Sequence, residues 1–213
     1  MKIRVLLADD HAMMRDGLQA LLQTATDIEV VGSVGNGREA VDMAIAAKPD
    51  VAIMDVSMPD MNGIEATDLL RDRLPGVRVV MLSMHSSSEH VYRALGAGAA
   101  GYLLKESAGE EIVSAVRAVH AGRQYLSRAL AGLDRRTAPR DGTASPLESL
   151  SARERQVLQL VVEGHSSAEI AAMVHLSPKS VDTYRSRLMK KLGIADVTGL
   201  VKFAIQHGLT PSG

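Results

Sequence analysis

Five polar side chains follow short apolar runs that have the composition of buried β-strands. They are Asp9 and Asp10, then Asp55, then Ser83, and last Lys105. Ligands of open α/β sheets bind at the edge where the carboxyl ends of parallel strands meet, so these side chains are expected to converge. Three carboxylates about 5 Å apart repel one another by roughly 3 kcal/mol per pair at an effective dielectric constant near 20. A divalent cation relieves that repulsion, and an all-oxygen ligand set favours Mg2+.

The same five groups suit the transfer of a phosphoryl group to a carboxylate. Asp55 is the candidate nucleophile. Lys105 is a cation that can pair with Asp55 or with a phosphoryl group on it, and the Ser83 hydroxyl can donate to a phosphoryl oxygen. Each residue taken alone is explained more simply as a loop residue or helix cap at a strand end. Five of them at corresponding strand ends favour a site.

A second candidate site is a basic stretch near the end of the chain. Residues 177–191 hold five Lys and Arg against one Asp, a net charge of +4. The turn at residues 174–177 joins two helical segments, which is typical of a helix-turn-helix whose second helix lies in the major groove of DNA. A solvated amphipathic helix is the alternative, but the helix caps, the turn spacing and the absence of balancing acids favour DNA binding. The residues expected to face bases or phosphates are Lys179, Ser180, Asp182, Thr183, Arg185, Ser186, Arg187, Lys190 and Lys191.

Composition excludes several other classes of function. The 213 residues include no cysteine, which removes disulfides, thiolate zinc sites and cysteine nucleophiles. Tryptophan is absent and aromatic residues make up 2%, which disfavours binding of single strands by base stacking. No apolar run reaches the roughly 18 residues that a membrane span needs, and the first apolar stretch is too short for a signal peptide. We therefore expect a cytoplasmic protein with no membrane partner.

The elements that must position these residues follow from periodicity. Short apolar runs at residues 3–8, 29–34, 51–54, 77–83 and 101–104 alternate with segments of helical period at 11–23, 38–47, 63–72, 87–95 and 109–121. Five such repeats predict an α/β domain with a parallel sheet covered by helices on both faces.

The part of the chain after residue 124 differs from the first part in charge and in composition. Residues 1–124 hold 12 Lys and Arg against 17 Asp and Glu, a net charge of −5, whereas the whole chain carries −1. Residues 125–149 are rich in Gly, Pro, Ser and Thr and are predicted to be a linker, with one short helix near residues 127–133. Residues 150–213 are predicted to be all-α with four helices. Ser151 with Glu154 and Ser166 with Glu169 form capping boxes, and Ser177 caps the third helix.

Four strings in the first 124 residues resemble the receiver domain of bacterial two-component response regulators: LLADDH, MDVSMPDMNG, VVMLS and GYLLKES. The resemblance implies a five-stranded, doubly wound parallel sheet of strand order 2-1-3-4-5. It also implies that a sensor histidine kinase phosphorylates Asp55 and that Ser83 and Lys105 hold the phosphoryl group. Tyr102 is then the aromatic side chain whose rotamer follows phosphorylation. The implied Mg2+ ligands are Asp10, Asp55, the carbonyl of Ser57, and Asp9 through water.

Residues 150 to about 209 are similar to the LuxR-type helix-turn-helix, and the two halves together resemble response regulators of the NarL/FixJ group. This resemblance implies a phosphorylation-switched transcription factor that binds a double-stranded operator as a homodimer through its last helix, residues 197–207. Asp182 stands where lysine is common in this group. Because an acid accepts a hydrogen bond from cytosine N4 but repels phosphate, Asp182 is expected to change which bases are read.

Two other functions remain as alternatives. The first is a phosphohydrolase with an aspartyl nucleophile, which is disfavoured because Ser57 stands where a second acid would serve as general acid. The second is a DNA-binding regulator that does not depend on phosphorylation, which the complete acid set and Lys105 disfavour. We therefore expect no enzymatic activity beyond phosphorylation and dephosphorylation of the protein itself.

Overall fold

The computed structural model describes residues 2–132, 146–207 and 209. The chain divides into two compact units, residues 1–133 and 134–213, and each has its own hydrophobic core.

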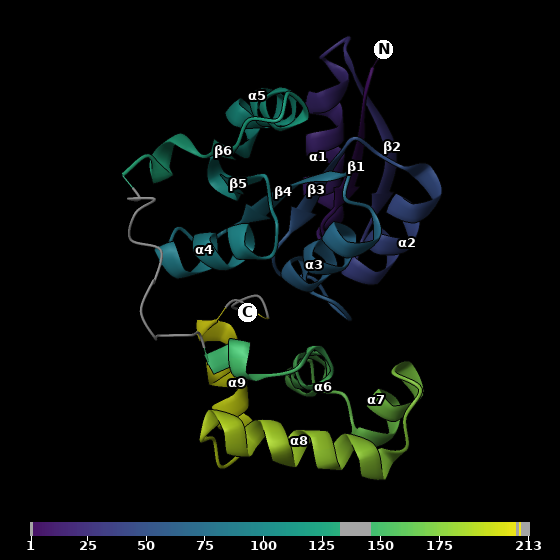
Figure 1. The fold of residues 1–213 in the computed structure, drawn as a ribbon, viewed down its shortest axis with the longest axis vertical. Helices are drawn as coiled ribbons and strands as arrows, with labels where there is room; N and C mark the ends of the chain where they lie inside the picture. Colours follow the sequence, from purple (N-terminus) through teal and green to yellow (C-terminus); the bar gives the residue numbers. More distant parts are fainter. Residues whose placement is uncertain (1, 133–145, 208, 210–213) are drawn as a thin grey trace. The chain divides into compact units, whose positions relative to one another are not determined.

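The first unit is built on a six-stranded parallel sheet of order β2-β1-β3-β4-β5-β6 (Figure 1). The predicted order of the first five strands is confirmed, and a short sixth strand, parallel to β5, extends the sheet. The strands are β1 (Ile3–Ala8), β2 (Ile28–Val34), β3 (Val51–Asp55), β4 (Arg78–Ser83), β5 (Gly101–Leu104) and β6 (Tyr125–Leu126).

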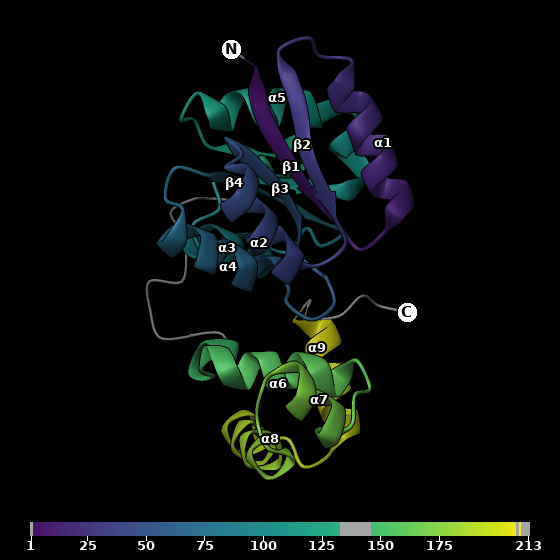
Figure 2. The ribbon, with the colours of Figure 1, turned by 90° about the vertical axis from the view of Figure 1, so that its right-hand side faces the viewer.

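Helices cover both faces of this sheet, as the apolar strands predict (Figures 1 and 2). Along β1, Leu6 packs into one core cluster, whereas Val5 and Leu7 pack into the cluster on the opposite face. This alternation follows from the two-residue period of a strand. The helices are α1 (Ala12–Gln23) and α5 (Ala108–His120) on one face, and α2 (Gly37–Ala47), α3 (Gly63–Arg73) and α4 (Ser88–Gly96) on the other.

The start of the predicted linker belongs to the sheet instead. The Tyr125 N–H donates to the carbonyl of Ala100 (3.1 Å), and the Ser127 N–H donates to that of Tyr102 (2.9 Å). The helix predicted near residues 127–133 is a 3-10 turn at Arg128–Leu130, whose Leu130 is buried in the core. A two-residue strand has too few positions to show a periodic pattern, so the sequence did not reveal it. The stretch 133–145 of the predicted linker lies outside the described residues.

The second unit is helical, as predicted. Both capping boxes are confirmed: each serine accepts from the backbone N–H three residues on, and each glutamate accepts from the serine N–H. Pro178 begins the third helix and Gly193, in the left-handed conformation, ends it. After a 3-10 turn at Pro146–Ser149 come α6 (Ala152–Val162), α7 (Ser167–Met173), α8 (Pro178–Leu192) and α9 (Val197–Gln206).

Gly63 marks a close approach between α3 and the end of β3. A Cβ atom at Gly63 would lie 2.0 Å from the carbonyl oxygen of Asp55. Since that atom belongs to the backbone, we expect Gly63→Ala to lower the free energy of unfolding of the first unit by about 1–3 kcal/mol. Gly109→Ala, in the first turn of α5 with no atom within 4 Å of the new methyl group, is the matched control. It should stabilise by about 0.5–1 kcal/mol. Urea unfolding measures both, and equal losses would contradict the packing argument.

Candidate functional site

Carboxylates gather at the carboxyl ends of two neighbouring strands. Asp55 is the last residue of β3, and Asp9 and Asp10 follow β1, which pairs with β3. One ligand atom from each of these aspartates and from His11 lies within 4.8 Å of the others. Asp9 and Asp55 are buried, at 2% and 3% exposure, whereas Asp10 is partly exposed. The fold therefore brings together the three acids that the sequence singled out.

The ammonium group of Lys105 lies among these acids. Its Nζ is 2.8 Å from Asp55 Oδ2 and 2.8 Å from Asp9 Oδ2, and the side chain is only 8% exposed. Burial lowers the pKa of Lys105, but Asp55 and Asp9 outweigh burial and raise that pKa above its ordinary value. Lys105 thus stays charged and neutralises part of the buried negative charge.

One lysine does not compensate two buried carboxylates. Burial, and after it the charge of Asp9, raise the pKa of Asp55 to about 7, although Lys105 opposes both. The oxygens of Asp9, Asp10 and Asp55 are hard donors, and a hard divalent cation is the group that such a set fits. Ser57, the fourth predicted ligand, is partly buried in the loop that follows β3.

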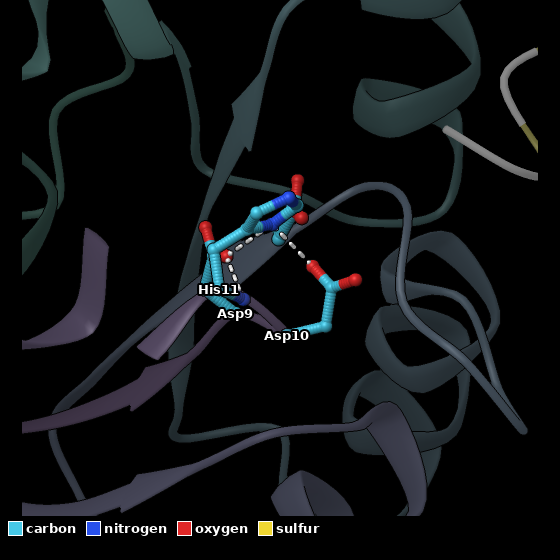
Figure 3. A group of neighbouring side chains, drawn as sticks. Asp9, Asp10 and His11 are labelled. Atoms are coloured by element: carbon cyan, nitrogen blue, oxygen red, sulfur yellow. Dashed lines mark hydrogen bonds and ion pairs between the residues drawn. The ribbon is translucent and has the colours of Figure 1, made fainter. Parts of the chain in front are cut away.

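His11 belongs to the cluster, although no role was predicted for it from the sequence. Its backbone N–H donates to Asp9 Oδ1 (2.8 Å), and its ring Nδ1 lies 2.7 Å from Asp10 Oδ1 (Figure 3). The side chain is 60% exposed, so it borders the acids on their solvent side. The available signal was its position directly after two aspartates. His11 therefore contacts both acids.

Ser83 and Tyr102 both form hydrogen bonds with the backbone of His85. The Ser83 Oγ, at the end of β4, accepts from the His85 N–H (3.0 Å). The Tyr102 hydroxyl, on β5, donates to the His85 carbonyl (2.8 Å). Tyr102 is fully buried, and burial raises the pKa of its hydroxyl to about 12, so it remains a donor. The loop after β4 is therefore bonded to both residues.

The second candidate site lies along α8. Val181 and Leu188 are fully buried, as their spacing predicts, so the opposite side of the helix faces solvent. A surface hollow gathers six of the nine predicted DNA-facing residues: Lys179, Asp182, Thr183, Ser186, Arg187 and Lys190.

The other three predicted residues, Lys191, Arg185 and Ser180, are engaged within the protein, as is Asp182. Lys191 Nζ donates to Glu154 Oε2 (2.7 Å) and to the Ser149 carbonyl (3.1 Å), which ties α8 to the start of α6. Asp182 Oδ1 accepts from Ser167 Oγ of α7 (2.7 Å) and pairs with Arg185 (3.2 Å).

Ser180 hydrogen-bonds to the helix cap Ser177, with 2.9 Å between their hydroxyl oxygens. The basic residues that are left differ from those described above. Lys179, Arg187 and Lys190 form no ion pair with any side chain in the described parts of the chain. Their charges therefore remain available to phosphates.

Lys191 and Lys190 are adjacent but should differ in their effect on stability. We expect Lys191→Met to lower the free energy of unfolding of the C-terminal unit by about 1 kcal/mol, because Glu154 is buried and loses its cation. Lys190→Met, the control, should leave it unchanged.

Acid should remove this difference. Burial raises the pKa of Glu154, but Lys191 and Ser151 outweigh burial and lower it overall. A lowered folded-state pKa gives stability that is present above the unfolded value of about 4.3 and lost as pH falls through the folded value. Thermal unfolding at neutral and acid pH tests this; a penalty for Lys191→Met that persists in acid would contradict it.

The chain matches two family models. The model described as the response regulator receiver domain matches residues 5–117, and that of the bacterial regulatory proteins of the luxR family matches residues 148–204. Both matches agree with the division of the chain into two units.

Whole proteins and solved structures agree with these models. Transcriptional regulatory protein MctR of Rhizobium johnstonii is 41% identical over 208 residues, covering 98% of this chain and 95% of that protein. Response regulator protein VraR of Staphylococcus aureus is 40% identical over 210 residues, covering 98% and 99%. The crystal structure of a LuxR-family two-component response regulator from Aurantimonas sp. is 34% identical, with a TM-score of 0.59, over 62% of this chain and 94% of that one. The chain belongs to the two-component response regulators of the NarL/FixJ group, with a receiver domain followed by a LuxR-type DNA-binding domain.

Proposed function

We propose that Asp55 accepts a phosphoryl group from a sensor histidine kinase and that this modification controls binding of the C-terminal unit to operator DNA. The observation that carries the proposal is the position of Lys105, whose buried ammonium group lies 2.8 Å from both Asp55 and Asp9. A preplaced cation of this kind stabilises the charge that arrives with a phosphoryl group.

The residues of the site have distinct roles in the transfer. An oxygen of Asp55 forms the new P–O bond while the bond from phosphorus to the donor imidazole breaks, and the leaving imidazole takes up a proton. Lys105 holds a phosphoryl oxygen. Ser83 Oγ accepts from the His85 N–H, and its hydroxyl can donate to another phosphoryl oxygen.

Asp9, Asp10, Asp55 and the carbonyl of Ser57 are the groups that we propose hold Mg2+, with Asp9 acting through water. The acids fit because they offer oxygens only and lie within one small cluster. When bound, the ion supplies positive charge that neutralises the phosphoryl oxygens. We assign Tyr102 as the side chain whose rotamer follows phosphorylation, because Tyr102 and Ser83 both hydrogen-bond to the backbone of His85.

For the C-terminal unit we propose that α8 enters the major groove. Lys179, Ser180, Asp182, Thr183 and Ser186 then face bases, and Arg185, Arg187 and Lys190 face phosphates. Lys191 was predicted to contact DNA. We assign it instead to stabilising the fold, because its ammonium group pairs with the buried Glu154 carboxylate. We propose that α9 forms the dimer contact, since Val197 and Ile205 on it are 44% and 36% exposed.

The proposed partners place this protein in the cytoplasm, where operator DNA is found. In the parts of the chain that the structure describes, every helix is too short or too polar to cross a membrane. Self-phosphorylation and self-dephosphorylation are the only reactions that we assign to the chain.

The assignment of Asp55 is tested by intact-mass measurement. Incubation of the full chain with acetyl phosphate, a small phosphodonor, and Mg2+ should add the mass of one phosphoryl group. Asp55→Asn should abolish this gain, and omission of Mg2+ should nearly do so. Asp60→Asn is the control because Asp60 lies in the same loop with φ 63°, a conformation that asparagine adopts readily. Stoichiometric labelling of the Asp55→Asn variant would move the site elsewhere.

The available charges on α8 are tested by the salt dependence of DNA binding. Arg187→Ala or Lys190→Ala should weaken binding to every sequence. Each should reduce the slope of log affinity against log salt concentration by about one unit per lost phosphate contact. Lys191→Ala, measured where the unit is fully folded, should leave the slope unchanged. A slope change for Lys191→Ala equal to that for Lys190→Ala would contradict the assignment.

Asp182 should affect base preference rather than overall affinity. Asp182→Ala is expected to shift preference among operator variants by roughly 1–3 kcal/mol at one or two positions. It also releases Arg185, so the salt slope should stay constant or become steeper. Titrations against a small operator library at several salt concentrations measure both quantities. Uniform weakening with every preference intact would show that α8 does not lie in the groove as proposed.

A further inference from the structure

Glu111 is a buried acid that neither the phosphorylation site nor the DNA-binding helix uses. It lies on α5, is 3% exposed, and accepts three hydrogen bonds. The donors are the Tyr125 hydroxyl (2.9 Å), the Ser127 hydroxyl (3.2 Å) and the Arg128 N–H (3.2 Å). All three belong to the segment that leaves the receiver unit toward the DNA-binding unit. Glu111 therefore anchors the beginning of the connection between the units.

Ser127 extends this anchor toward Lys105. It is fully buried, and its single hydroxyl hydrogen goes to Glu111. The Ser107 hydroxyl lies 2.7 Å from the Ser127 hydroxyl and 3.3 Å from the Leu104 carbonyl, so it can donate to either, and the Leu104 N–H donates to the Ser127 hydroxyl at 3.4 Å. Leu104 and Ser107 stand on either side of Lys105 in the sequence. Glu111 thus fixes the backbone that carries the phosphoryl-binding lysine.

The 3-10 turn η1 (Lys105–Ser107) is consequently held at both ends. At one end the Lys105 ammonium group bonds to Asp55 and Asp9, and at the other Ser107 bonds to Ser127. A phosphoryl group on Asp55 places its oxygens beyond the Asp55 oxygen that Lys105 now contacts. Lys105 must move to follow them. A 2.7 Å hydrogen bond tolerates little stretching, so movement of η1 strains the contact with Ser127.

We propose that Glu111 is a positioning residue for Lys105, acting through Ser127 and Ser107, and that it couples phosphorylation of Asp55 to release of residues 125–130. The inference rests on the proposed function of Asp55 and Lys105. Phosphorylation loosens the segment that leads to the DNA-binding unit. By thermodynamic linkage, loosening that segment favours the phosphorylated form to the same extent.

Hydrogen exchange of the full chain, followed by mass spectrometry, tests the anchor and the coupling together. In the wild type, acetyl phosphate with Mg2+ should speed exchange in residues 125–130 by about tenfold, the scale of one lost hydrogen bond. Ser127→Ala and Glu111→Gln should show fast exchange there without phosphorylation, and phosphorylation should add little. Ser114→Ala and Glu110→Gln, exposed positions of α5, are matched controls and should behave as wild type.

A second readout separates positioning from mere structural support. Beryllofluoride with Mg2+ mimics a bound phosphoryl group and gives an equilibrium affinity by calorimetry. Ser127→Ala should bind it about fivefold more tightly than the wild type, because the segment is already released. Simple loss of structure predicts the same or weaker binding, and that result would overturn the coupling.

The outcomes distinguish this inference from the function on which it rests. If intact mass shows phosphorylated Asp55 and exchange in residues 125–130 is unchanged, the coupling is wrong and the proposed function stands. If Asp55 gains no phosphoryl group, the proposed function fails and the coupling fails with it. If Ser127→Ala leaves exchange of the unmodified chain unchanged, the anchor itself is wrong, whether or not Glu111→Gln folds.

Discussion

The receiver unit depends on one interaction, the buried ammonium group of Lys105 between Asp55 and Asp9. Two carboxylates removed from water at this depth destabilise the fold unless a cation accompanies them. Asp9 follows β1, Asp55 ends β3 and Lys105 begins the turn after β5, so the parallel sheet brings them together at one edge. Compensation by one lysine is incomplete, as the raised pKa of Asp55 shows. The same imbalance is the physical basis of the proposed binding of a divalent cation.

In the DNA-binding unit, the basic residues of α8 differ in whether they form ion pairs within the protein. Of the five basic residues on α8, Lys191 stabilises a buried glutamate and Arg185 pairs with Asp182, whereas Lys179, Arg187 and Lys190 form no ion pair among the described side chains. A helix that looks uniformly basic in sequence is thus divided into charges that hold the domain together and charges that are available to a polyanion. The division matters because charges without an internal partner are the ones expected to contribute most to the salt dependence of DNA binding.

The last described residues of the receiver unit are bonded to the turn that carries Lys105. Residues 125–128 complete the edge of the sheet and bond to Glu111 and Ser107, and Ser107 is two residues from Lys105. The buried ammonium group, the turn η1 and the first residues beyond the sheet therefore form one bonded series. A change of charge at Asp55 reaches the end of the receiver unit through neighbours that are in direct contact.

The sequence by itself determined the elements and the acid cluster. The apolar period of strands and helices, capping boxes such as Ser151 with Glu154, and polar residues at strand ends are all local signals in the sequence. Parallel pairing of the strands then brings the polar residues at the strand ends together into one site. Only the tertiary structure decided the roles of Glu111, Lys191 and Asp182. Their partners lie 16, 37 and 15 residues away in sequence. A hydrogen bond between such distant residues leaves no periodic or neighbouring pattern, because it exists only once packing has brought the two side chains together.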